Sequence, residues 1–420
     1  MDKELNKQVE SFSGLGISPR ILEILTKLNY VVPTPIQAQA IPIAIGGKDV
    51  VGIAQTGTGK TLAFGIPMIM RLAETKGRGL VVVPTRELAV QVEEALQKIG
   101  REIGLRTTVL IGGLAIAPQI KALARDPHII VATPGRLNDH LEQKTVNLNN
   151  VRVVVLDEAD RMLDMGFKPQ IERIFKKITG ERQTMLFSAT MPPAIMTMAR
   201  TYMKLPICVE VSPAGTTVEK VTQEIYITSN ETKFRLVEKI LEKYSCPILI
   251  FTRTKFGAKR LTMKIQNLGH QAAEIHSNRS VGQRREALDG FKANKYRILV
   301  ATDIASRGID VTGIGLVINF DLPTNTEDYV HRIGRTARAG ADGHAISFVS
   351  PDQLGDLRDI EKLIKKSLPV SPLPELPPER IQPITPRKYS PAPAEPSRFK
   401  KFNHSKSRGP RRPGQFRKRY

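Results

Sequence analysis

The sequence is poor in the features of disulfide-rich, secreted and membrane-spanning proteins. Only two cysteines, Cys208 and Cys246, occur in 420 residues, and their wide separation excludes a disulfide framework and a cysteine-based zinc site. No apolar run approaches the roughly 18 residues needed to cross a bilayer. The first ten residues, MDKELNKQVE, mix charges and lack the apolar core of a secretory signal. We therefore expect a cytoplasmic protein without a membrane partner.

Acidic residues are too few to balance the basic ones. The chain holds 63 Lys and Arg against 41 Asp and Glu, which gives a formal net charge of +22. Such an excess favours a polyanionic partner, either nucleic acid or an acidic membrane surface. Half of it lies in residues 387–420, where twelve Lys or Arg and five aromatic residues accompany a single acid, Glu395. Pro and Gly interrupt this segment, which disfavours a membrane-binding helix, so we predict a disordered tail that holds nucleic acid.

Apolar runs rich in Val, Ile and Leu alternate with helical patterns through the rest of the chain. Nearly continuous apolar character is typical of strands buried on both faces, and their alternation with helices predicts parallel α/β sheets. The first half contains six predicted strands: Asp49–Ala54, Gly79–Pro84, Thr107–Ile111, Ile129–Ala132, Val151–Leu156 and Thr184–Ser188. The second half contains six more: Glu224–Thr228, Ile248–Thr252, Ala272–Ile275, Arg297–Thr302, Leu316–Phe320 and Ala345–Val349. Helices are predicted between them, for example over Arg86–Ile103, where Leu88, Val92, Leu96 and Ile99 share one face.

The alternation pauses once, in a segment with the composition of a linker. Residues 212–220, SPAGTTVEK, contain Pro, Gly and adjacent Thr and show no apolar period. A chain of this length is expected to form roughly two or three domains. We therefore predict an α/β domain over residues 1–212, a linker at 213–220, and a second α/β domain over 221–367. From Leu368 the chain becomes rich in proline, so we expect residues 368–420 to form a disordered tail.

The strongest local signal is a glycine-rich loop between an apolar strand and a helical pattern. It reads Ala54-Gln55-Thr56-Gly57-Thr58-Gly59-Lys60-Thr61. Glycine lets the backbone approach an anion closely, and backbone N–H groups at the start of a helix hold phosphates. The lysine would neutralise the charge of the β- and γ-phosphates, and the last threonine would supply a hydroxyl to Mg²⁺. Ala54 stands where the usual pattern has glycine.

A second chemical signal follows the strand predicted at Val151–Leu156. There the sequence continues Asp157-Glu158-Ala159-Asp160, which places acids at the carboxyl end of a buried strand, where α/β ligand sites form. Asp157 would orient Mg²⁺ through water, and Glu158 would polarise the attacking water. Together with the glycine-rich loop, these acids predict an enzyme that hydrolyses a nucleoside triphosphate.

These two segments resemble the motifs of the DEAD-box RNA helicases, which belong to helicase superfamily 2. The remaining motifs of that family occur in the expected order between Phe12 and Pro351. They are NYVVPTPIQ at 29–37, PTRELA at 84–89, the glycine pair at 112–113, TPGR at 133–136, SAT at 188–190, IFTR at 250–253, ATDIASRGID at 301–310 and HRIGRTAR at 331–338. Within the family, DEADRMLDMGF and TVEKVTQEIY look most like the bacterial RhlE-type enzymes.

The resemblance implies a fold, a reaction and further nucleotide contacts. The two domains would be tandem RecA-like domains with parallel sheets. The protein would be an ATP-dependent RNA helicase that opens RNA duplexes or RNA–protein complexes locally and without processivity. Phe12 would stack on adenine, Gln37 would bind the exocyclic edge of the base, and Asp310 would contact the ribose. Without the resemblance, Phe12 would more often be an ordinary core residue.

The second domain would complete the ATP site, because the resemblance places basic groups there. Arg335 and Arg338 would reach the γ-phosphate as arginine fingers, since a guanidinium fork matches phosphate oxygens. His331 would couple the SAT segment to the DEAD carboxylates. Closure of the two domains would then link ATP binding to RNA binding.

RNA would lie across both domains on contacts that do not read its sequence. The residues implied are Arg86, Gly113, Thr133, Arg136, Thr252, Arg284 and Thr302. Such contacts go to phosphate and 2′-hydroxyl groups, so they separate RNA from DNA. Four positions depart from the family's pattern without removing a catalytic group: Asn29, Ser277, Val281 and Ala337. Of these, Ser277 and Val281 adjoin the RNA contacts of the second domain.

Two other functions fit part of the same observations. A non-enzymatic RNA-binding or annealing protein would use the basic tail and would need no hydrolytic groups. A DNA helicase would share the ATP motifs. The intact set Lys60, Asp157, Glu158 and Arg338 favours an enzyme. The RNA itself stays open among ribosomal precursors, messenger RNA decay complexes and RNAs handled during cold adaptation.

Overall fold

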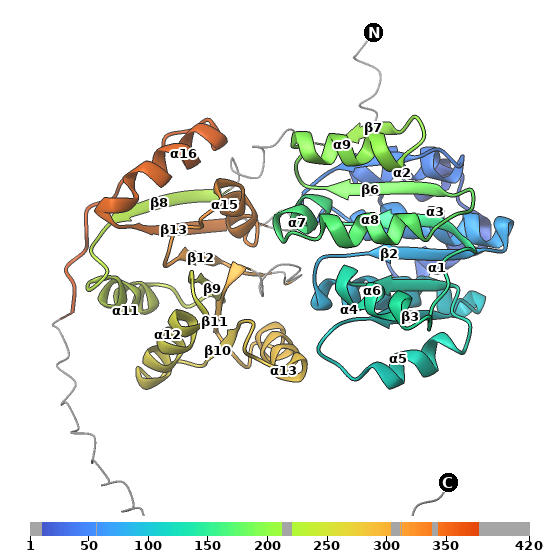
Figure 1. Cartoon of the computed structure of the whole chain (residues 1–420). Coiled ribbons are helices and arrows are strands. Elements are labelled where there is room, and N and C mark those ends of the chain that lie inside the picture. The colour runs from blue at the N-terminus through green and yellow to red at the C-terminus, as the bar shows by residue number, and fades with distance from the viewer. Residues whose placement is uncertain are drawn as a thin grey trace, which may run out of the picture. The chain divides into compact units, whose positions relative to one another are not determined.

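The computed structural model describes residues 11–55, 57–211, 221–303, 311, 313–337 and 343–377. These residues form two parallel sheets with helices packed on their faces (Figure 1). We call residues 11–211 the first lobe and residues 221–377 the second lobe. The linker predicted at 213–220 and residues 378–420 of the predicted tail lie outside the described residues.

The first lobe is built on a seven-stranded sheet in the order β3-β4-β2-β5-β6-β1-β7, and every neighbouring pair is parallel. Its strands are β1 (Val50–Ile53), β2 (Arg78–Val82), β3 (Thr107–Leu110), β4 (Ile129–Ala132), β5 (Val151–Leu156), β6 (Gln183–Ser188) and β7 (Ile207–Glu210). Its α-helices are α1 (Pro19–Lys27), α2 (Pro35–Ile45), α3 (Lys60–Thr75), α4 (Arg86–Gly100), α5 (Ile116–Leu123), α6 (Pro134–Glu142), α7 (Ala159–Asp164), α8 (Lys168–Lys176) and α9 (Pro193–Tyr202). The six strands predicted for this half are confirmed.

The second lobe is built on a six-stranded parallel sheet in the order β10-β11-β9-β12-β13-β8. Its strands are β8 (Val221–Ile227), β9 (Ile248–Phe251), β10 (Ala272–Ile275), β11 (Ile298–Ala301), β12 (Leu316–Asn319) and β13 (Gly343–Val349). Its described α-helices are α11 (Lys233–Lys243), α12 (Lys255–Asn267), α13 (Val281–Lys292), α15 (Thr326–Ile333) and α16 (Leu354–Ile364). All six strands predicted here are observed, so the prediction of two parallel α/β sheets is confirmed.

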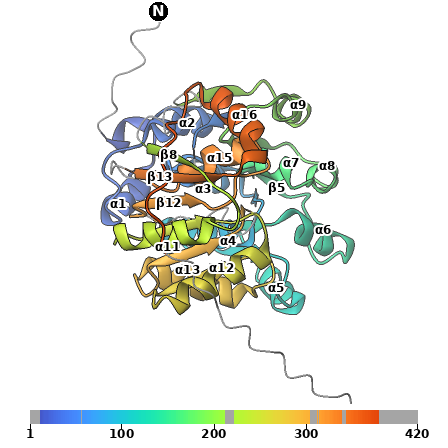
Figure 2. The ribbon, with the colours of Figure 1, turned by 90° about the vertical axis from the view of Figure 1, so that its left-hand side faces the viewer.

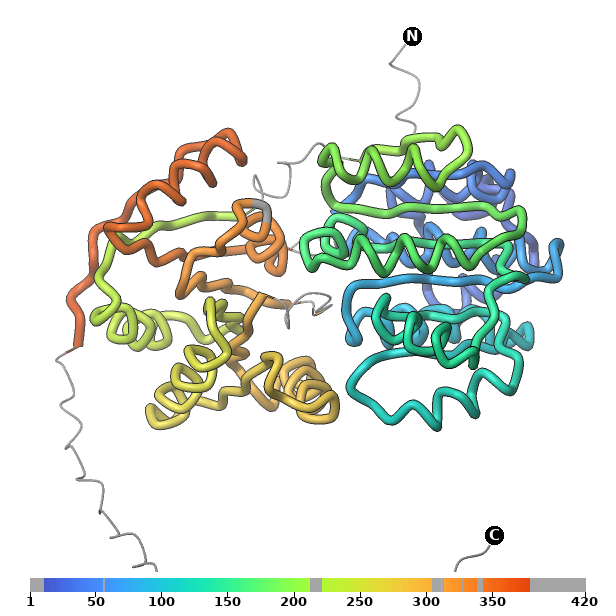
Figure 3. Tube along the Cα trace, in the orientation of Figure 1, coloured from blue at the N-terminus to red at the C-terminus, as the bar shows by residue number. Residues whose placement is uncertain are grey.

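The central strands of each sheet are buried on both faces because they are apolar at almost every position. Successive residues of a strand point to opposite faces, and in β2 Val81 joins the core beneath α2, α3 and α4, while Leu80 and Val82 join the core beneath α6, α8 and α9. In the second lobe α11 and α12 cover one face, and α13, α15 and α16 cover the other (Figures 2 and 3). None of the helices in the described part of the chain combines the length and apolar character of a membrane span.

One strand of the first sheet has no counterpart in the sequence prediction. β7 pairs with β1 at the edge of the sheet. Of its four side chains only Val209 is buried. An edge strand is covered on fewer sides, so its sequence lacks the apolar run that reveals a central strand.

The helix predicted over Arg86–Ile103 ends earlier than expected. α4 stops at Gly100, and Arg101–Ile103 form a 3₁₀ turn that ends at Gly104. Gly104 has φ 74°, a left-handed conformation that glycine adopts at low cost and that closes a helix. The apolar period continues through this turn, so the period alone overestimates the length of the helix.

The described structure continues past Leu368, where the sequence predicts the start of a disordered tail. Residues 368–377 lie along the second lobe, and Val370 forms a parallel bridge with Ile225 of β8. The N–H of Ile225 donates to the carbonyl of Pro369 at 2.9 Å. Proline lacks an N–H but keeps its carbonyl acceptor, so a proline-rich segment can still pair with the edge of a sheet. The prediction of disorder is wrong for these ten residues.

Candidate functional site

The glycine-rich loop lies at the carboxyl end of β1 and folds around its own lysine. Gly57 and Gly59 have φ values of 84° and 88°, which L side chains rarely adopt. Lys60 is the first residue of α3, and its Nζ donates to the carbonyl of Ala54 at 2.9 Å. The loop therefore places a lysine, a helix N-terminus and backbone N–H groups together, which is the arrangement that binds phosphate.

Gln37 of α2 fastens this loop to the N-terminal segment. Its Oε1 accepts from the N–H of Thr34 at 2.9 Å, and its Nε2 donates to the carbonyl of Gly59 at 3.0 Å. A Cβ at Gly59 would lie 2.3 Å from that Nε2, so only glycine fits. Within the loop, the Thr58 hydroxyl donates to the carbonyl of Gln55 at 2.7 Å. The sequence does not reveal this loop-holding role of Gln37; one N–H of its amide is left for the predicted adenine contact.

The other members of the N-terminal motif take different positions. Phe12 is 4% exposed and belongs to the core of the first lobe, as the ordinary interpretation of a lone phenylalanine expects. Its stacking on adenine stays a prediction. Asn29, which replaces a glycine of the family's pattern, has φ 59° and so occupies the left-handed region that asparagine tolerates.

Asp157 follows β5 directly and is almost completely buried. Its Oδ1 accepts from the N–H of Glu158 at 2.9 Å. Burial raises the pKa of the Asp157 carboxyl to about 6, although the nearby Lys60 opposes that rise. No group of three or more His, Cys, Asp or Glu able to hold a metal occurs in the described part of the chain. One buried carboxylate, Asp157, and the hydroxyl of Thr61 in the first turn of α3 are a donor set that fits Mg²⁺, which is usually held by one or two carboxylates plus substrate phosphates.

Replacing Asp157 with asparagine should stabilise the protein in the absence of Mg²⁺ and nucleotide. The folded pKa of about 6 lies above the ordinary 3.8, so the folded state binds the extra proton between these values and stability falls as the pH rises through this window. The shift corresponds to about 3 kcal/mol at neutral pH. We expect D157N to be the more stable protein at pH 7.5 and to lose that advantage towards pH 4, as measured by urea unfolding. An advantage that does not change with pH would contradict the assignment.

Glu158 is the acid placed to act on water. It has φ 53°, and its Oε2 accepts from Nη1 of Arg161 at 2.9 Å in a pair that is almost wholly buried. Burial pushes the pKa of Glu158 upward, but Arg161, Lys60 and Arg335 outweigh it, so the pKa lies below its usual value. Among the described residues its Oε1 is buried without a hydrogen-bond partner. A charged, buried oxygen without a partner is suited to hold a water molecule.

Asp160 joins the DEAD segment to the SAT segment, a role that sequence reasoning missed. Its Oδ2 accepts from the backbone N–H groups of Ala189 and Thr190 and from the Thr190 hydroxyl, each at 3.0 Å. The Asp160 N–H in turn donates to Ser188 Oγ at 3.3 Å. These segments are about 30 residues apart in the chain, and they meet because β5 and β6 are neighbours in the sheet. The sequence carries no local signal of this pairing.

Arg332 is the centre of a second network that the motif did not single out. It is 2% exposed, and its guanidinium donates to both oxygens of Asp303, at 2.6 and 2.7 Å. It also donates to Asn319 Oδ1 at 3.1 Å and to the carbonyl of Asp321 at 2.6 Å. The ring of Phe251 lies 5.0 Å from its Cζ. Arg332 therefore holds together the segments that follow β9, β11 and β12, where predicted RNA-binding residues lie.

Two of the predicted catalytic residues of the second lobe lie next to the DEAD segment. Arg335 is buried and contributes to the lowered pKa of Glu158. Burial, followed by Arg161 and Arg335, holds the pKa of His331 well below its usual value, so the imidazole is neutral at pH 7. His331, Arg335 and Arg161 line one small cavity. Three other predicted residues lie outside the described part of the chain: Thr56, Asp310 and Arg338.

Three arginines predicted to bind RNA form a positive cluster. Arg86, at the start of α4, lies over the second glycine of the pair, because a Cβ at Gly113 would meet its Nη1 at 2.0 Å. Burial and then Arg284 lower the pKa of Arg86, with Arg136 adding to the effect. Arg136 donates to the carbonyl of Leu114 at 3.0 Å. The guanidinium groups of this cluster repel one another at a surface lined by glycine. The phosphate backbone of a nucleic acid would stabilise such an arrangement.

The remaining predicted RNA contacts sit at the ends of strands and the starts of helices. Thr133 precedes α6, Thr252 follows β9, and Thr302 follows β11. Of these, Thr252 is fully buried, and its hydroxyl donates to the carbonyl of Thr254 at 3.3 Å. Val281 is the first residue of α13, after the Ser280 cap. That Val281 and Ser277 weaken RNA contacts of the second lobe stays a hypothesis.

Family comparisons match both lobes. Residues 34–198 match the family described as DEAD/DEAH box helicase, and residues 232–340 match the family described as helicase conserved C-terminal domain. The chain is 41% identical over 378 residues to an ATP-dependent rRNA helicase RRP3 of Debaryomyces hansenii, covering 89% of this chain and 79% of that protein. It is 43% identical over 361 residues to the DEAD-box ATP-dependent RNA helicase CshA of Geobacillus kaustophilus, covering 85% of this chain and 77% of that protein.

Solved structures resemble the fold over most of its length. Saccharomyces cerevisiae Dbp5 bound to RNA and ADP BeF3 matches with a TM-score of 0.78 at 29% identity, covering 86% of this chain and 95% of that one. Mss116p bound to ssRNA and AMP-PNP matches with a TM-score of 0.79 at 28% identity, covering 87% of this chain and 78% of that one.

Proposed function

This chain belongs to the DEAD-box family of ATP-dependent RNA helicases, and from that membership we propose how its residues divide the work. The first lobe binds ATP through the loop 54–61 and supplies Glu158 to polarise the attacking water. The second lobe supplies Arg335 and Arg338 to the γ-phosphate. The observation that carries the proposal is the buried Oε1 of Glu158, which has no hydrogen-bond partner among the residues that the structure describes and whose carboxylate interacts with Lys60 and Arg335.

Mg²⁺ belongs to the same proposal. Asp157, through water, and the Thr61 hydroxyl are the oxygen donors that would hold it, and when bound it neutralises charge on the β- and γ-phosphates. The protein's own contribution is to bury the carboxylate and to hold it through the Glu158 N–H. We expect ATP affinity to fall when EDTA is added.

ATP and RNA are proposed to favour each other's binding, because each ligand contacts both lobes. For RNA, Arg86 and Arg136 lie in the first lobe and Arg284 in the second, and Arg284 Nη2 lies 2.7 Å from Oε1 of Glu87. A ligand that binds only the joined lobes stabilises the joined state, so the coupling is reciprocal. Bending one strand in that state opens a duplex locally, and hydrolysis then releases it. This scheme predicts non-processive unwinding.

The test is ATP turnover with and without nucleic acid. We expect single-stranded RNA to raise turnover several-fold, and DNA of the same length and sequence to raise it much less, because the predicted contacts include 2′-hydroxyl groups. A duplex of about one helical turn should open, while one of several turns should not. Equal turnover with and without RNA would overturn the coupling, and equal stimulation by DNA would favour a DNA helicase.

The basic segment 387–420 is proposed to tether RNA. Its net charge of +11 and five aromatic residues suit sequence-independent binding of the backbone and bases. Deleting 387–420 should weaken RNA binding in fluorescence anisotropy and flatten its dependence on salt, because fewer counterions are released. ATP turnover without RNA should not change. Loss of that basal turnover would contradict a tether.

We also propose a cellular RNA substrate and a branch of the family for this protein. Relatives named as rRNA helicases support a ribosomal precursor RNA, with messenger RNA decay complexes as the alternative. The RhlE-type assignment rests on DEADRMLDMGF and TVEKVTQEIY, whereas the relatives reported above carry the names RRP3 and CshA. A cytoplasmic location also stays a prediction. Crosslinking in cells followed by sequencing of the bound RNA tests the substrate.

A further inference from the structure

A cavity of about 730 Å³ lies at the edge of the first lobe away from the ATP motifs. Arg78, His128 and Asn150 line it, and they stand at or just before the first residues of β2, β4 and β5. Ala54 and Asp157 follow the last residues of β1 and β5. Because the strands are parallel and β5 is six residues long, about 20 Å separates the two edges. The cavity is therefore distinct from the nucleotide site.

The cavity has an apolar floor of the size that binds ligands. Ile21 of α1, Ile69 and Leu72 of α3, and Leu105 after the 3₁₀ turn contribute to it. Its volume falls within the range of about 300–1,000 Å³ that is typical of binding sites. The floor would accept a large aliphatic or aromatic side chain.

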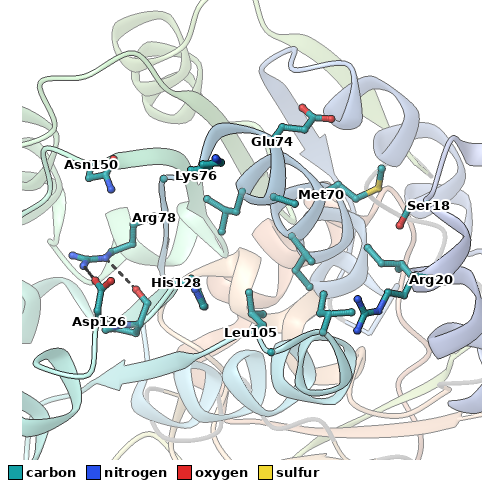
Figure 4. A pocket seen from close by; sticks show the side chains of 18 residues that line it. Ser18, Arg20, Met70, Glu74, Lys76, Arg78, Leu105, Asp126, His128 and Asn150 are labelled. Carbon is teal, nitrogen blue, oxygen red and sulfur yellow. Dashed lines mark hydrogen bonds and ion pairs between the residues drawn. The ribbon is translucent and has the colours of Figure 1, made fainter.

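Charged groups stand at the two ends of this floor. Figure 4 shows Arg20 at one end and Lys76, Arg78 and Asp126 towards the other, with Met70 and Leu105 between them. Arg78 is already paired, since its Nη2 lies 2.6 Å from Asp126 Oδ1. Arg20 donates to the carbonyl of Glu102 at 3.0 Å. Glu74, which also lines the cavity, is paired with Arg71 at 2.7 Å. Among the ion pairs of the described residues, neither Arg20 nor Lys76 has a carboxylate partner, so each end presents an exposed cation.

Two candidate occupants fit this chemistry poorly. The chain's own segment 387–420 carries a net charge of +11 and would be repelled by Arg20 and Lys76. Single-stranded RNA would meet the cations, but the lining includes no Phe, Tyr or Trp on which bases could stack. An apolar floor between two cations instead complements an apolar side chain flanked by carboxylates.

We propose that this cavity is a docking site for an acidic linear peptide of a partner protein, which inserts one large apolar side chain between Arg20 and Lys76. α3 connects the site to the enzyme's chemistry, since Lys60 is its first residue and the cavity is lined by its last turns. The docking site goes beyond the helicase activity. Its test reads peptide binding, so its failure would leave the proposed ATP and RNA chemistry untouched.

The test uses the full chain and the fluorescein-labelled peptide Asp-Glu-Phe-Leu-Asp-Glu in fluorescence anisotropy. We expect saturable binding that is lost with Asp-Glu-Ala-Ala-Asp-Glu, because only the apolar anchor differs, and with Lys-Lys-Phe-Leu-Lys-Lys, because the charge is reversed. The basic segment 387–420 attracts any acidic peptide, but it does so equally in every variant of the protein and does not require the Phe-Leu anchor.

Two variants of the protein locate the binding. The double variant Arg20→Glu, Lys76→Glu should weaken binding at least about tenfold, which corresponds to about 1.4 kcal/mol. Ala73→Trp, on the exposed side of α3, should do the same by filling the cavity. The matched control is Lys98→Glu, Lys121→Glu, which makes the same change in charge at exposed positions of α4 and α5 and should leave binding within about twofold. ATP turnover should be unchanged in all of these variants.

Three results would overturn the docking site. One is no saturable binding of the Phe-Leu peptide to the unaltered chain. A second is equal weakening by the cavity variants and by the control, which would assign the binding to net charge. The third is displacement of the peptide by single-stranded RNA together with loss of RNA affinity in the double variant, which would make Arg20 and Lys76 part of the RNA surface.

Discussion

Replacing Glu158 with glutamine is expected to lower ATP turnover by roughly 100-fold or more while ATP still binds. The amide keeps the size of the side chain and can still accept the hydrogen bond from Arg161, so the fold around the DEAD segment is preserved. It removes the negative charge on the buried oxygen that has no partner within the described residues. A neutral amide oxygen polarises water far less than a carboxylate does, so hydrolysis slows and binding does not.

The measurement is single-turnover ATP hydrolysis together with the affinity for a fluorescent ATP analogue. Glu181→Gln is the matched control, because Glu181 is an exposed acid of the same lobe whose one ion pair within the described part of the chain is a 3.4 Å contact with Lys204. It should hydrolyse ATP at the normal rate. If E158Q keeps turnover within about threefold of the unaltered protein, Glu158 is not the group that acts on water. The variant should also hold RNA longer in the presence of ATP. Hydrolysis, which would release RNA from the state in which both lobes bind the ligands, no longer takes place.

Replacing Arg332 with methionine is expected to destabilise the second lobe by about 3–5 kcal/mol. Methionine fills much of the same volume but removes the Arg332 guanidinium from four hydrogen-bond acceptors: both oxygens of Asp303, Oδ1 of Asn319 and the carbonyl of Asp321. The Asp303 carboxylate, only 22% exposed, would lose its ion pair with Arg332. Breaking one partner of such a pair costs more than the pair itself contributes, because the remaining charge stays buried.

Hydrogen exchange read by mass spectrometry can assign this loss to the correct lobe, because the two lobes need not unfold together. Peptides from β11 and β12 should exchange faster in R332M, and those from β1 and β5 should not. Arg358→Met, at an exposed position of α16, is the control and should leave exchange unchanged. The double variant with Asp303→Asn should recover part of the lost stability, since the carboxylate that Arg332 no longer neutralises is then gone. A loss below about 1 kcal/mol in R332M would show that the network is dispensable.

Much of the fold was predictable because its signals are local. Central strands such as β5 and β9 are buried on both faces, so they need apolar residues at every position and are visible as runs. The loop at 54–61 was equally visible, since left-handed φ values and close approach to an anion both require glycine. The apolar-run signal does not reveal an edge strand such as β7, because a mostly exposed strand needs no apolar run.

Hydrogen-bond partners that lie far apart in the sequence were not predictable. Asp49 accepts from the N–H of Thr184, 135 positions away, and Tyr329 donates to Gln223 across 106 positions. Neither pair produces a spacing that a motif or period could reveal. Gln37 was predicted to bind adenine, and only the packing of α2 against the loop shows that it also holds Gly59.

The scarcity of cysteine, of long apolar runs and of acids to balance the bases determined the class of this protein, and the ordered motifs determined its family and the residues that handle ATP. These properties belong to single segments, so the order of amino acids is sufficient to carry them. The tertiary structure alone decided that Asp160 binds the SAT segment, that Arg332 joins three strand ends, and that separated segments enclose the cavity beside Arg20 and Lys76. Such features depend on which strands become neighbours, and that is set by the packing of the whole lobe.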